Sequence, residues 1–336
     1  ICACLVGSEM CIRDRYRGDQ KMVKYVEVAQ TIMDEVKKAV IGKDECVKKI
    51  LAAILAGGHI LIEDIPGVGK TTMALAFAKS MSLVQNRVQF TPDVLPADIT
   101  GFSMYDKKRG EFYYEPGAVM CNLLLADEIN RTSPKTQSAL LEVMEEGTVT
   151  IDKVTREVPH PFIVIATENP IGSAGTQMLP EAQLDRFFIC LTIGYPNMEQ
   201  EIEIVKGNQS GNLTERIKSV LKAEQLTLLQ EEVEEMYIHD VIYNYIGELV
   251  TETRKHPMIE LGISPRGTVA LAKMTKAIAY LNGRSYCVPK DVQEIFENVA
   301  RHRIQLNAKA RLNRVKVQEI IEEILINVQA PNPKHR

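Results

Sequence analysis

The chain of 336 residues is 45% hydrophobic and 25% charged, with a formal net charge of −4 at pH 7. This length allows two domains and a large hydrophobic core, and the mildly acidic balance gives no support to nucleic acid as a partner. No apolar run approaches the ~20 residues that a membrane helix needs, and no secretory signal is visible, so we expect no membrane partner.

The first 21 residues show no clear hydrophobic period, and Cys2, Cys4 and Cys11 lack the spacing of a zinc site. We expect residues 1–21 to form a disordered or non-native tail outside the fold. The other four of the seven cysteines lie among apolar or small neighbours. This pattern is typical of reduced core cysteines and predicts a cytoplasmic protein.

The segment from Met22 to Ile54 carries apolar residues at helical spacing and stops at Gly57 and Gly58. The next residues, His59–Asp64, are mostly apolar and β-branched, which predicts a strand buried on both faces. A glycine loop and a second helical run follow. Strand, glycine loop and helix in this order form the context in which a phosphate-binding loop is expected.

Further apolar segments predict more strands, with helices between them. These segments are Arg87–Phe90, Asn122–Glu128, Phe162–Asn169 and Phe187–Ile193. The alternation predicts an α/β domain with a parallel sheet at residues 22–195. Residues 148–158 alternate with period two, which predicts a hairpin standing off the sheet. After Tyr195 the strands stop, and helical patterns predict a smaller all-helical domain at residues 196–330.

The stretch LIEDIPGVGKTT, residues 61–72, matches the pattern G-x-x-x-x-G-K-[ST] except at its first place, where Asp64 replaces glycine. Gly67 and Gly69 allow backbone N–H groups to converge on a phosphate, whose charge Lys70 would neutralise. The alternative is a glycine-rich turn with a surface lysine.

Asp127 and Glu128 end an apolar strand, so both acids emerge at the carboxyl edge of the parallel sheet, where ligands bind. Asp127 and the hydroxyl of Thr71 are candidates to hold Mg²⁺, and Glu128 to orient and polarise a water molecule. Asn169 ends the next strand, and its amide is a candidate to orient the same water. Capping of the next helix by the acids, and a turn before Pro170, are the alternatives.

Three arginines are candidates to neutralise the negative charge that develops on a phosphate group during its transfer. Arg131 and Arg186 could reach the nucleotide of a neighbouring subunit, because a guanidinium binds such charge with two donors. Either could instead form an ordinary surface ion pair. Arg266 opens a helix of the C-terminal domain and could bring a second positive charge.

Five motifs occur in order: ILIEDIPGVGKTT, LLLADEINRTSPKTQSALLEVMEEGTV, VIATENP, LPEAQLDRF and GISPRG. Together they resemble the MoxR family of AAA+ ATPases over roughly Met22 to Leu306. The resemblance implies a P-loop AAA+ parallel sheet with flanking helices, followed by a helical lid, and implies ATP and Mg²⁺ as cofactors.

The resemblance also implies roles for single residues. Nucleotide-binding positions are implied in Walker A and in the VIGK segment that cups adenine: Val40, Ile41, Gly42, Pro66, Gly67, Val68, Gly69, Lys70, Thr71 and Thr72. Walker B is implied at Asp127 and Glu128. Sensor 1 is implied at Asn169, an arginine finger at Arg186 and sensor 2 at Arg266.

Members of this family often carry Glu-Asp at the positions of Glu63 and Asp64, so the resemblance implies an intact loop. Aspartate also tolerates left-handed backbone dihedrals better than most residues.

The stretch Phe90–Val119 is too long for a simple crossover. It matches the insertion in the second helix that marks the clade of MoxR, magnesium-chelatase and McrB-like proteins. With the 148–158 hairpin, it is expected to face a ring pore or a client protein. The candidate contact residues are Tyr105, Phe112, Tyr113 and Tyr114, and the alternative is that these aromatic rings pack the base of the insertion.

The resemblance implies a homo-oligomeric ring, expected to be a hexamer, because an arginine finger from one subunit completes the site of the next. It further implies chaperone-like assembly or activation of partner proteins or metal cofactors, often with von Willebrand factor A domain proteins. Two alternatives stay open. One is a nucleotide-gated binding module with negligible turnover, and the other is a McrB-like or magnesium-chelatase-like motor subunit. The basic segment 301–317 is the best support for a motor that acts on nucleic acid, and a solvated helix face explains that segment at least as well.

Overall fold

The computed structural model describes residues 19–65, 67–169, 179–209 and 213–331. Of the expected N-terminal tail, residues 1–18 lie outside these ranges. The first helix, α2 (Asp19–Lys37), begins three residues before the predicted start at Met22.

A five-stranded parallel sheet forms the centre of the molecule, with the strand order β2-β5-β8-β1-β9. Every predicted strand of this sheet is confirmed to within two residues at either end. The strands are β1 (His59–Glu63), β2 (Gln85–Gln89), β5 (Leu123–Asp127), β8 (Ile163–Glu168) and β9 (Phe187–Leu191).

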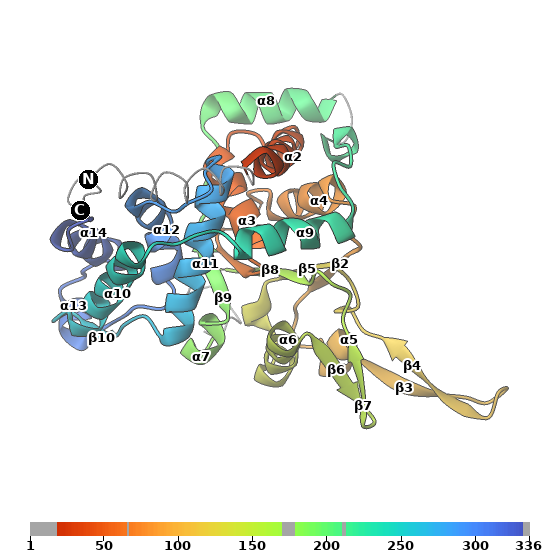
Figure 1. Cartoon of the computed structure of the whole chain (residues 1–336). Coiled ribbons are helices and arrows are strands. Elements are labelled where there is room, and N and C mark those ends of the chain that lie inside the picture. The colour runs from red at the N-terminus through yellow and green to blue at the C-terminus, as the bar shows by residue number, and fades with distance from the viewer. Residues whose placement is uncertain (1–18, 66, 170–178, 210–212, 332–336) are drawn as a thin grey trace, which may run out of the picture.

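Helices cover both faces of the sheet, which explains why the central strands are apolar along their whole length. Successive side chains of a strand point to opposite faces, so Leu123 and Leu125 join one buried cluster while Leu124 joins the other. The first face packs against α2, α3 (Asp44–Leu55) and α4 (Lys70–Ser80), and the second against α6 (Pro134–Glu146) (Figure 1).

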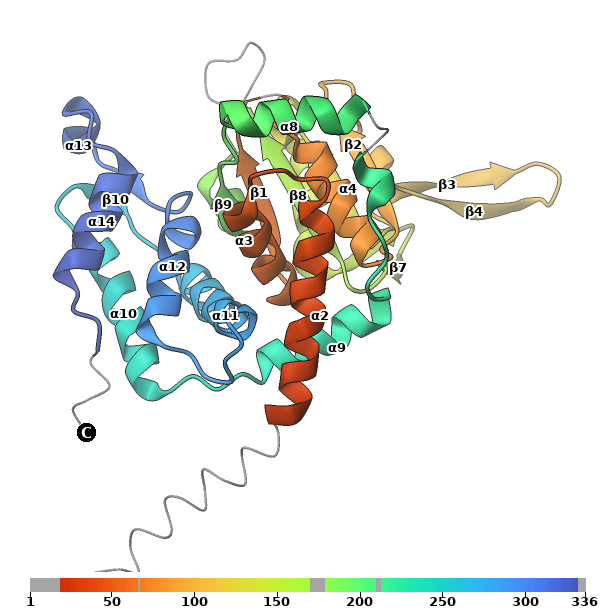
Figure 2. The ribbon, with the colours of Figure 1, turned by 90° about the horizontal axis from the view of Figure 1, so that it is seen from above.

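The stretch between β2 and β5 contains a short helix and a hairpin. The helix is α5 (Pro96–Thr100), and the hairpin pairs β3 (Gly101–Asp106) with β4 (Glu111–Pro116). Figures 1 and 2 show this hairpin projecting far from the body of the molecule. A second hairpin, β6 (Thr148–Ile151) with β7 (Val154–Glu157), confirms the alternating pattern read at residues 148–158.

Helices make up most of the chain after β9, and those from Asp240 onward gather at one side of the sheet (Figure 2). The helices after β9 are α8 (Met198–Gln209), α9 (Ala223–Glu234), α10 (Asp240–Lys255), α11 (Pro265–Leu281), α12 (Pro289–Ala300), α13 (Ala308–Leu312) and α14 (Val317–Asn327). The expectation that strands stop after Tyr195 is wrong in one detail, because β10 (Ile259–Leu261) and β11 (Gln305–Leu306) form a short antiparallel pair. The domain boundary between residues 195 and 196 stays a prediction.

The ends of α6 and α11 carry capping residues. The hydroxyl of Ser133 accepts a hydrogen bond from the Thr136 N–H at the start of α6, and Gly147 ends the same helix in the left-handed conformation. Ser264 caps α11 in the same way, by accepting from the N–H of Gly267. Within the described ranges, no helix is both long enough and apolar enough to span a membrane.

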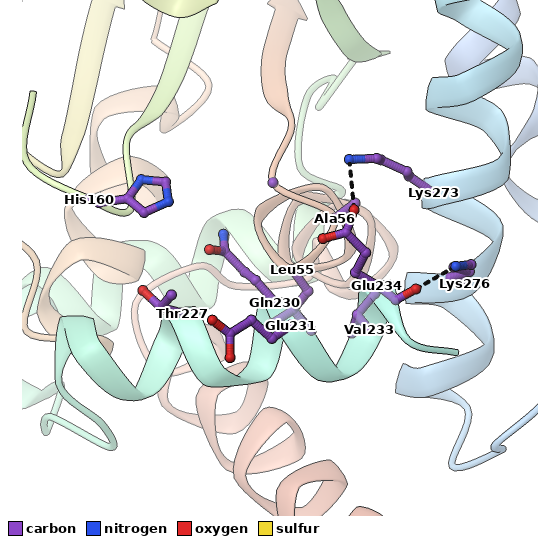
Figure 3. Close-up of a pocket in the computed structure, with 11 residues that line it drawn as sticks. Leu55, Ala56, His160, Thr227, Gln230, Glu231, Val233, Glu234, Lys273 and Lys276 are labelled. Carbon is purple, nitrogen blue, oxygen red and sulfur yellow. Dashed lines mark hydrogen bonds and ion pairs between the residues drawn. The ribbon is translucent and has the colours of Figure 1, made fainter. Parts of the chain in front are cut away.

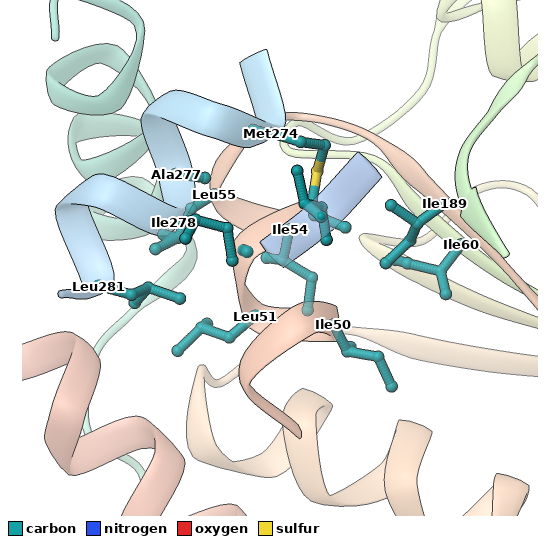
Figure 4. Packing of buried hydrophobic residues seen from close by; sticks show 14 of the residues in the cluster. Ile50, Leu51, Ile54, Leu55, Ile60, Ile189, Met274, Ala277, Ile278 and Leu281 are labelled. Atoms are coloured by element: carbon teal, nitrogen blue, oxygen red, sulfur yellow. The ribbon is translucent and has the colours of Figure 1, made fainter. Parts of the chain in front are cut away.

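The central helix α3 joins the sheet to the C-terminal helices. Its apolar residues pack on one side against β1 and β9 and on the other against α11 (Figure 4). Ile54 of α3 and Ile278 of α11 are both fully buried in this cluster. The position of α11, and hence of the residues at its start, therefore depends on apolar packing against α3.

This packing predicts a large stability loss when a buried side chain of α11 is shortened. Ile278→Ala is expected to lower the free energy of unfolding by roughly 2–5 kcal/mol, because it removes buried methylenes and leaves a cavity. The exposed Val269→Ala on the same helix is the matched control, with an expected change within about 0.5 kcal/mol. Urea denaturation followed by circular dichroism measures both, and equal stability of the two variants would contradict the packing.

Candidate functional site

The loop between β1 and α4 has the shape of an anion cradle. Gly67 and Gly69 have φ angles of 88° and 92°, a conformation that favours glycine. No atom of the described chain lies within 4 Å of a β-carbon built at either glycine. The start of α4 also carries no side-chain cap within the described ranges, so its N–H groups and positive dipole end are open to an anion.

Lys70, the first residue of α4, has a side chain that is mostly buried beside this loop. Its Nζ donates a hydrogen bond to the backbone oxygen of Asp64 at 2.6 Å. Burial lowers the pKa of Lys70, and the negative charges of Asp64, Asp127 and Glu128 oppose that change. The lysine is thus a buried cation held above the loop by a carbonyl group.

Asp64 is absent from the described residues with positive φ, so it does not use the left-handed backbone that an aspartate tolerates. Asp64 contributes to the site through the hydrogen bonds of its side chain. The buried carboxylate accepts hydrogen bonds from the N–H groups of Ile65 at 2.8 Å and of Ile193 and Gly194 at 2.6 Å each. Asp64 therefore serves as an acceptor for three amides rather than as a substitute for glycine flexibility.

Asp127 ends β5 and Glu128 follows it, so both acids lie at the carboxyl edge of the sheet. Asp127 accepts a hydrogen bond from the Thr167 hydroxyl at 2.7 Å and pairs with Arg87 at 2.7 Å. The same hydroxyl accepts from the N–H of Glu128 at 2.9 Å. Thr167 lies on β8, so one hydroxyl fixes both acids relative to the neighbouring strand.

Glu128 has a left-handed backbone, with φ 58° and ψ 47°, which is uncommon for a residue other than glycine. Its carboxylate pairs with Arg131 at 3.0 Å. Arg131 therefore lies beside the acid of its own chain, which favours the ion-pair interpretation of this arginine.

Asn169 follows β8 and is buried. Its backbone oxygen accepts a hydrogen bond from the side chain of Asn130 at 3.2 Å. Its side-chain Oδ1 has no hydrogen-bond partner among the described residues. A buried acceptor without a partner is costly, so this atom is suited to a ligand or a bound water.

These groups line one cavity of about 410 Å³, a size typical of ligand pockets. The lining residues are Gly67, Gly69, Lys70, Thr71, Thr72, Arg87, Gln89, Asp127, Glu128 and Asn169. Sequence reasoning missed Arg87 and Gln89. Their alternation on β2 puts both side chains on one face at the carboxyl end of the strand, and that period-two signal was readable in the sequence.

Other predicted nucleotide-binding residues lie outside this lining. Pro66 is outside the described residues. Val68 packs against the core cluster, and Val40 is buried in it. Gly42 accepts a hydrogen bond from the side chain of Gln200 at 3.4 Å, and Ile41 lies between these two neighbours. The segment Val40–Gly42 is therefore next to the start of α8 rather than in the cavity wall.

Arg186 and Arg266 also lie outside the cavity lining, and the structure brings them to each other. Both pair with the carboxylate of Glu145 near the end of α6, Arg186 through Nη1 and Arg266 through Nη2. Arg186 also donates to the backbone oxygen of Leu141 at 2.8 Å. One carboxylate thus holds two guanidinium groups from distant parts of the chain.

Asp185 connects the two segments that carry these arginines. It accepts a hydrogen bond from the Ser264 hydroxyl at 2.7 Å and pairs with the buried Arg303 at 2.7 Å. Asp185 directly precedes Arg186, and Ser264 caps the helix that carries Arg266. The two arginines are therefore joined through backbone neighbours as well as through Glu145.

The cavity fits a nucleotide triphosphate with a divalent cation. The open amides of the glycine loop and the buried Lys70 suit phosphate groups. The carboxylate of Asp127 and the hydroxyl of Thr71 are hard oxygen donors of the kind that Mg²⁺ takes. The partnerless Oδ1 of Asn169 suits a bound water.

Comparisons with known proteins agree with this fit. Residues 59–189 match the family model described as the ATPase family associated with various cellular activities (AAA), and residues 251–324 match the AAA lid domain. The chain is 37% identical to the protein named Chaperone MoxR1 of Mycobacterium tuberculosis over 94% of this chain and 85% of the relative. The chain belongs to the MoxR family of AAA+ ATPases, enzymes that hydrolyse ATP.

Two further relatives extend the likeness over nearly the whole chain. An uncharacterised protein of Bacillus subtilis, YeaC, is 46% identical over 89% of this chain and 93% of its own length. A solved structure from Cytophaga hutchinsonii is 34% identical with a TM-score of 0.87, covering 95% of this chain and 99% of the other. The AAA+ core followed by a helical lid region is therefore the fold of this MoxR-family chain.

A second cavity, of about 370 Å³, lies at the opposite end of the sheet (Figure 3). Gly57 before β1 and His160 before β8 line it, so it is at the amino ends of the strands. Lys273 and Lys276 in its wall are already engaged with Glu234, at 3.6 Å to the carboxylate and 2.5 Å to the backbone oxygen. Parallel α/β folds bind ligands at the other edge, so this cavity is separate from the nucleotide site.

The candidate client residues divide into two groups. Tyr105, Phe112 and Tyr113 are exposed on the projecting hairpin, with Phe112 73% exposed. Tyr114 instead donates to the backbone oxygen of Thr100 at 2.6 Å and lies under the guanidinium of Arg156. Tyr114 therefore packs the base of the insertion, whereas the other three rings are exposed on the hairpin.

Glu168, the last residue of β8, is a half-buried acid that precedes Asn169. Burial of its carboxyl group and, to a smaller extent, the charge of Glu63 on the adjacent strand together raise its pKa to about 7. Its Oε1 has no hydrogen-bond partner within the described ranges. Ionisation of Glu168 in the native state is therefore unfavourable.

This raised pKa predicts a pH-dependent stability difference. An unfolded glutamate titrates near pH 4.3, so between about pH 4.3 and 7 the native state binds the extra proton and loses stability as pH rises. Glu168→Gln removes this loss, so its free energy of unfolding relative to the parent is expected to increase from pH 5 to pH 8. Urea titrations of nucleotide-free protein measure it, with the exposed Glu157→Gln as control. A difference that is constant with pH would contradict the assignment.

Proposed function

We propose that this chain is a Mg²⁺-dependent ATP hydrolase that works in a homo-oligomeric ring, a hexamer, to assemble or activate partner proteins or metal cofactors. The AAA+ domain would occupy residues 22–195 and the lid residues 196–330. The observation that carries the proposal is the single cavity in which an anion cradle, a buried lysine, two acids and a partnerless amide oxygen meet.

Different residues in and around the cradle bind different parts of Mg·ATP. The N–H groups from Gly67 to Thr72 bind phosphate oxygens, and Lys70 leaves the carbonyl of Asp64 to neutralise phosphate charge. Thr71 and Asp127 would hold Mg²⁺, and the ion would supply positive charge against the charge that develops on the phosphate. The segment Val40–Gly42, beside the start of α8, contributes the adenine contact.

Glu128 and Asn169 act on the attacking water. Glu128 accepts its proton or polarises it, and the Oδ1 of Asn169 fixes its orientation. The hydrogen bond from the Glu128 N–H to Thr167, and the ion pair with Arg131, hold the acid in place before the water arrives. A protein that only binds nucleotide would need neither group.

Arg186 and Arg266 act together on the nucleotide of the neighbouring subunit. Neither lines the cavity of its own chain, and a single carboxylate, Glu145, balances both guanidinium groups. The pair therefore keeps surplus positive charge that suits the phosphate of an adjacent site. This arrangement supports a ring in which each subunit completes the site of the next.

The client surface is the projecting β3–β4 hairpin together with the β6–β7 hairpin beside it. The exposed rings of Tyr105, Phe112 and Tyr113 offer an apolar contact to a partner, such as a von Willebrand factor A domain protein. A chaperone-like role is supported by the relative named Chaperone MoxR1. A cytoplasmic location remains the expectation from cysteine usage.

Two substitutions separate binding from turnover. Lys70→Ala is expected to abolish Mg·ATP binding, because it removes the buried cation of the cradle. Glu128→Gln is expected to keep binding and to lower turnover by roughly 10²–10⁴-fold, because the amide cannot accept the proton of the water. Equilibrium binding of a fluorescent ATP analogue and steady-state phosphate release measure the two effects.

Lys309→Ala, which changes an exposed lysine of α13, is the control for both measurements. Hydrolysis by Glu128→Gln at the parental rate would remove Glu128 from the mechanism. Binding without hydrolysis by the parent protein would instead favour a nucleotide-gated binding module.

The proposed action between subunits predicts complementation. Arg186→Ala is expected to lose roughly 10³–10⁵-fold in turnover, as for other arginine fingers. Mixed with Lys70→Ala subunits, which keep Arg186, it should regain measurable activity, because some sites then combine an intact cradle with an intact arginine. Phosphate release across mixing ratios tests this, with Arg311→Ala, from an exposed ion pair, as control. Parental turnover in pure Arg186→Ala protein would refute the role.

A further inference from the structure

Asp64 occupies a place where a phosphate loop usually carries glycine, and its contacts extend beyond that loop. One carboxylate oxygen accepts the N–H of Ile65 inside the loop, and the other accepts the N–H groups of Ile193 and Gly194. The side chain is 5% exposed, so these three hydrogen bonds to a charged acceptor are shielded from water. The start of the loop is thus tied to a segment more than a hundred residues later in the chain.

That later segment is the joint between the sheet and the helices that follow. It begins after β9, which ends at Leu191, and leads into α8, which starts at Met198. Gly194 has a φ of 68°, a left-handed conformation that a glycine adopts without strain. All of α9 to α14, including the helix that carries Arg266, comes after this point in the chain.

The joint is held from its other side by Lys43. The Nζ of Lys43 donates to the backbone oxygens of Ile193 at 2.8 Å and Tyr195 at 3.0 Å. Asp64 therefore binds the N–H groups of the joint, and Lys43 binds its carbonyl groups. Asp64 lies next to the phosphate loop and Lys43 lies next to Val40–Gly42. These two opposite charges hydrogen-bond to the same short stretch of backbone.

Asp64 also contacts the lysine of the cradle. Its backbone oxygen accepts the hydrogen bond of Lys70, which the proposed function releases when phosphate is bound. We propose that Asp64 is a positioning residue that ties the phosphate loop to the Ile193–Gly194 joint, so that a change of partner at Lys70 is transmitted to the C-terminal helices. This inference rests on the proposed function of Lys70 and adds the route by which the bound state reaches the lid.

Two variants test Asp64 directly. Asp64→Asn keeps the shape but replaces one accepting oxygen with an NH₂ group, and Asp64→Gly restores the usual loop pattern without any acceptor. Hydrogen exchange of the peptide that contains Ile193 and Gly194 is measured by mass spectrometry, without nucleotide and with a non-hydrolysable ATP analogue. In the parent, exchange at these amides is expected to be slow and to change with the analogue.

In Asp64→Asn, exchange at the joint is expected to rise roughly ten- to hundredfold, because hydrogen bonds to a charged acceptor are lost. The response to the analogue should disappear and kcat should fall, while the Kd for the analogue changes within about threefold, since the Gly67–Thr72 amides and Lys70 remain. Asp240→Asn, which removes an exposed acid from α10, is the matched control. Parental exchange and parental kcat in both Asp64 variants would overturn the inference.

Lys43→Met provides a second route if the Asp64 variants do not fold. It removes the hydrogen bonds of Lys43 to the joint. We expect it to raise amide exchange at Ile193 and Gly194 and to lower kcat, as the Asp64 variants do. Unchanged exchange and kcat in Lys43→Met would count against the joint as a coupling element. Failure of the parent protein to bind the analogue would refute the proposed function itself, an outcome distinct from either variant result.

Discussion

A parallel sheet brings the carboxyl ends of all its strands to one edge, and the whole site depends on this constraint. The order β2-β5-β8-β1-β9 places the strand before the glycine loop beside β8, and β8 beside β5. Lys70, Asn169 and the acids at 127 and 128 therefore meet although they are far apart in the chain. The helix that starts at Lys70 adds the positive end of its dipole at the same edge. Hydrophobic burial on both faces holds the strands in register and so holds these groups together.

Charged groups around this edge are paired with other protein groups when no ligand is present. Arg87 pairs with Asp127, Arg131 with Glu128, and Lys70 with a backbone carbonyl. In the proposed function, nucleotide binding exchanges these partners for phosphate and Mg²⁺, so the net free energy of binding is the difference between two sets of strong contacts. Under that proposal the same exchange produces movement, because each released group is attached to a different element.

Local sequence patterns predicted the strands of the sheet, and contacts between distant segments explain what those patterns missed. Apolar runs predicted the five strands of the sheet, because a strand pattern depends on near neighbours in sequence. Gly67, Lys70 and Asp127 were likewise predictable as site residues from motif and strand context. The acceptor role of Asp64 was not, because its partners at 193 and 194 lie on another part of the chain. The shared carboxylate of Glu145 was hidden for the same reason, since its two arginines come from separate segments.

The left-handed backbone of Glu128 has a consequence for engineering the enzyme. A residue other than glycine in this conformation costs on the order of 1–3 kcal/mol, and here the Thr167 hydroxyl and the tight turn after β5 compel it. Glycine would relieve the strain but would delete the carboxylate that the proposed function assigns to the attacking water. Under that proposal stability and catalytic rate favour different residues at this one position, and a thermostable variant is best sought elsewhere in the fold.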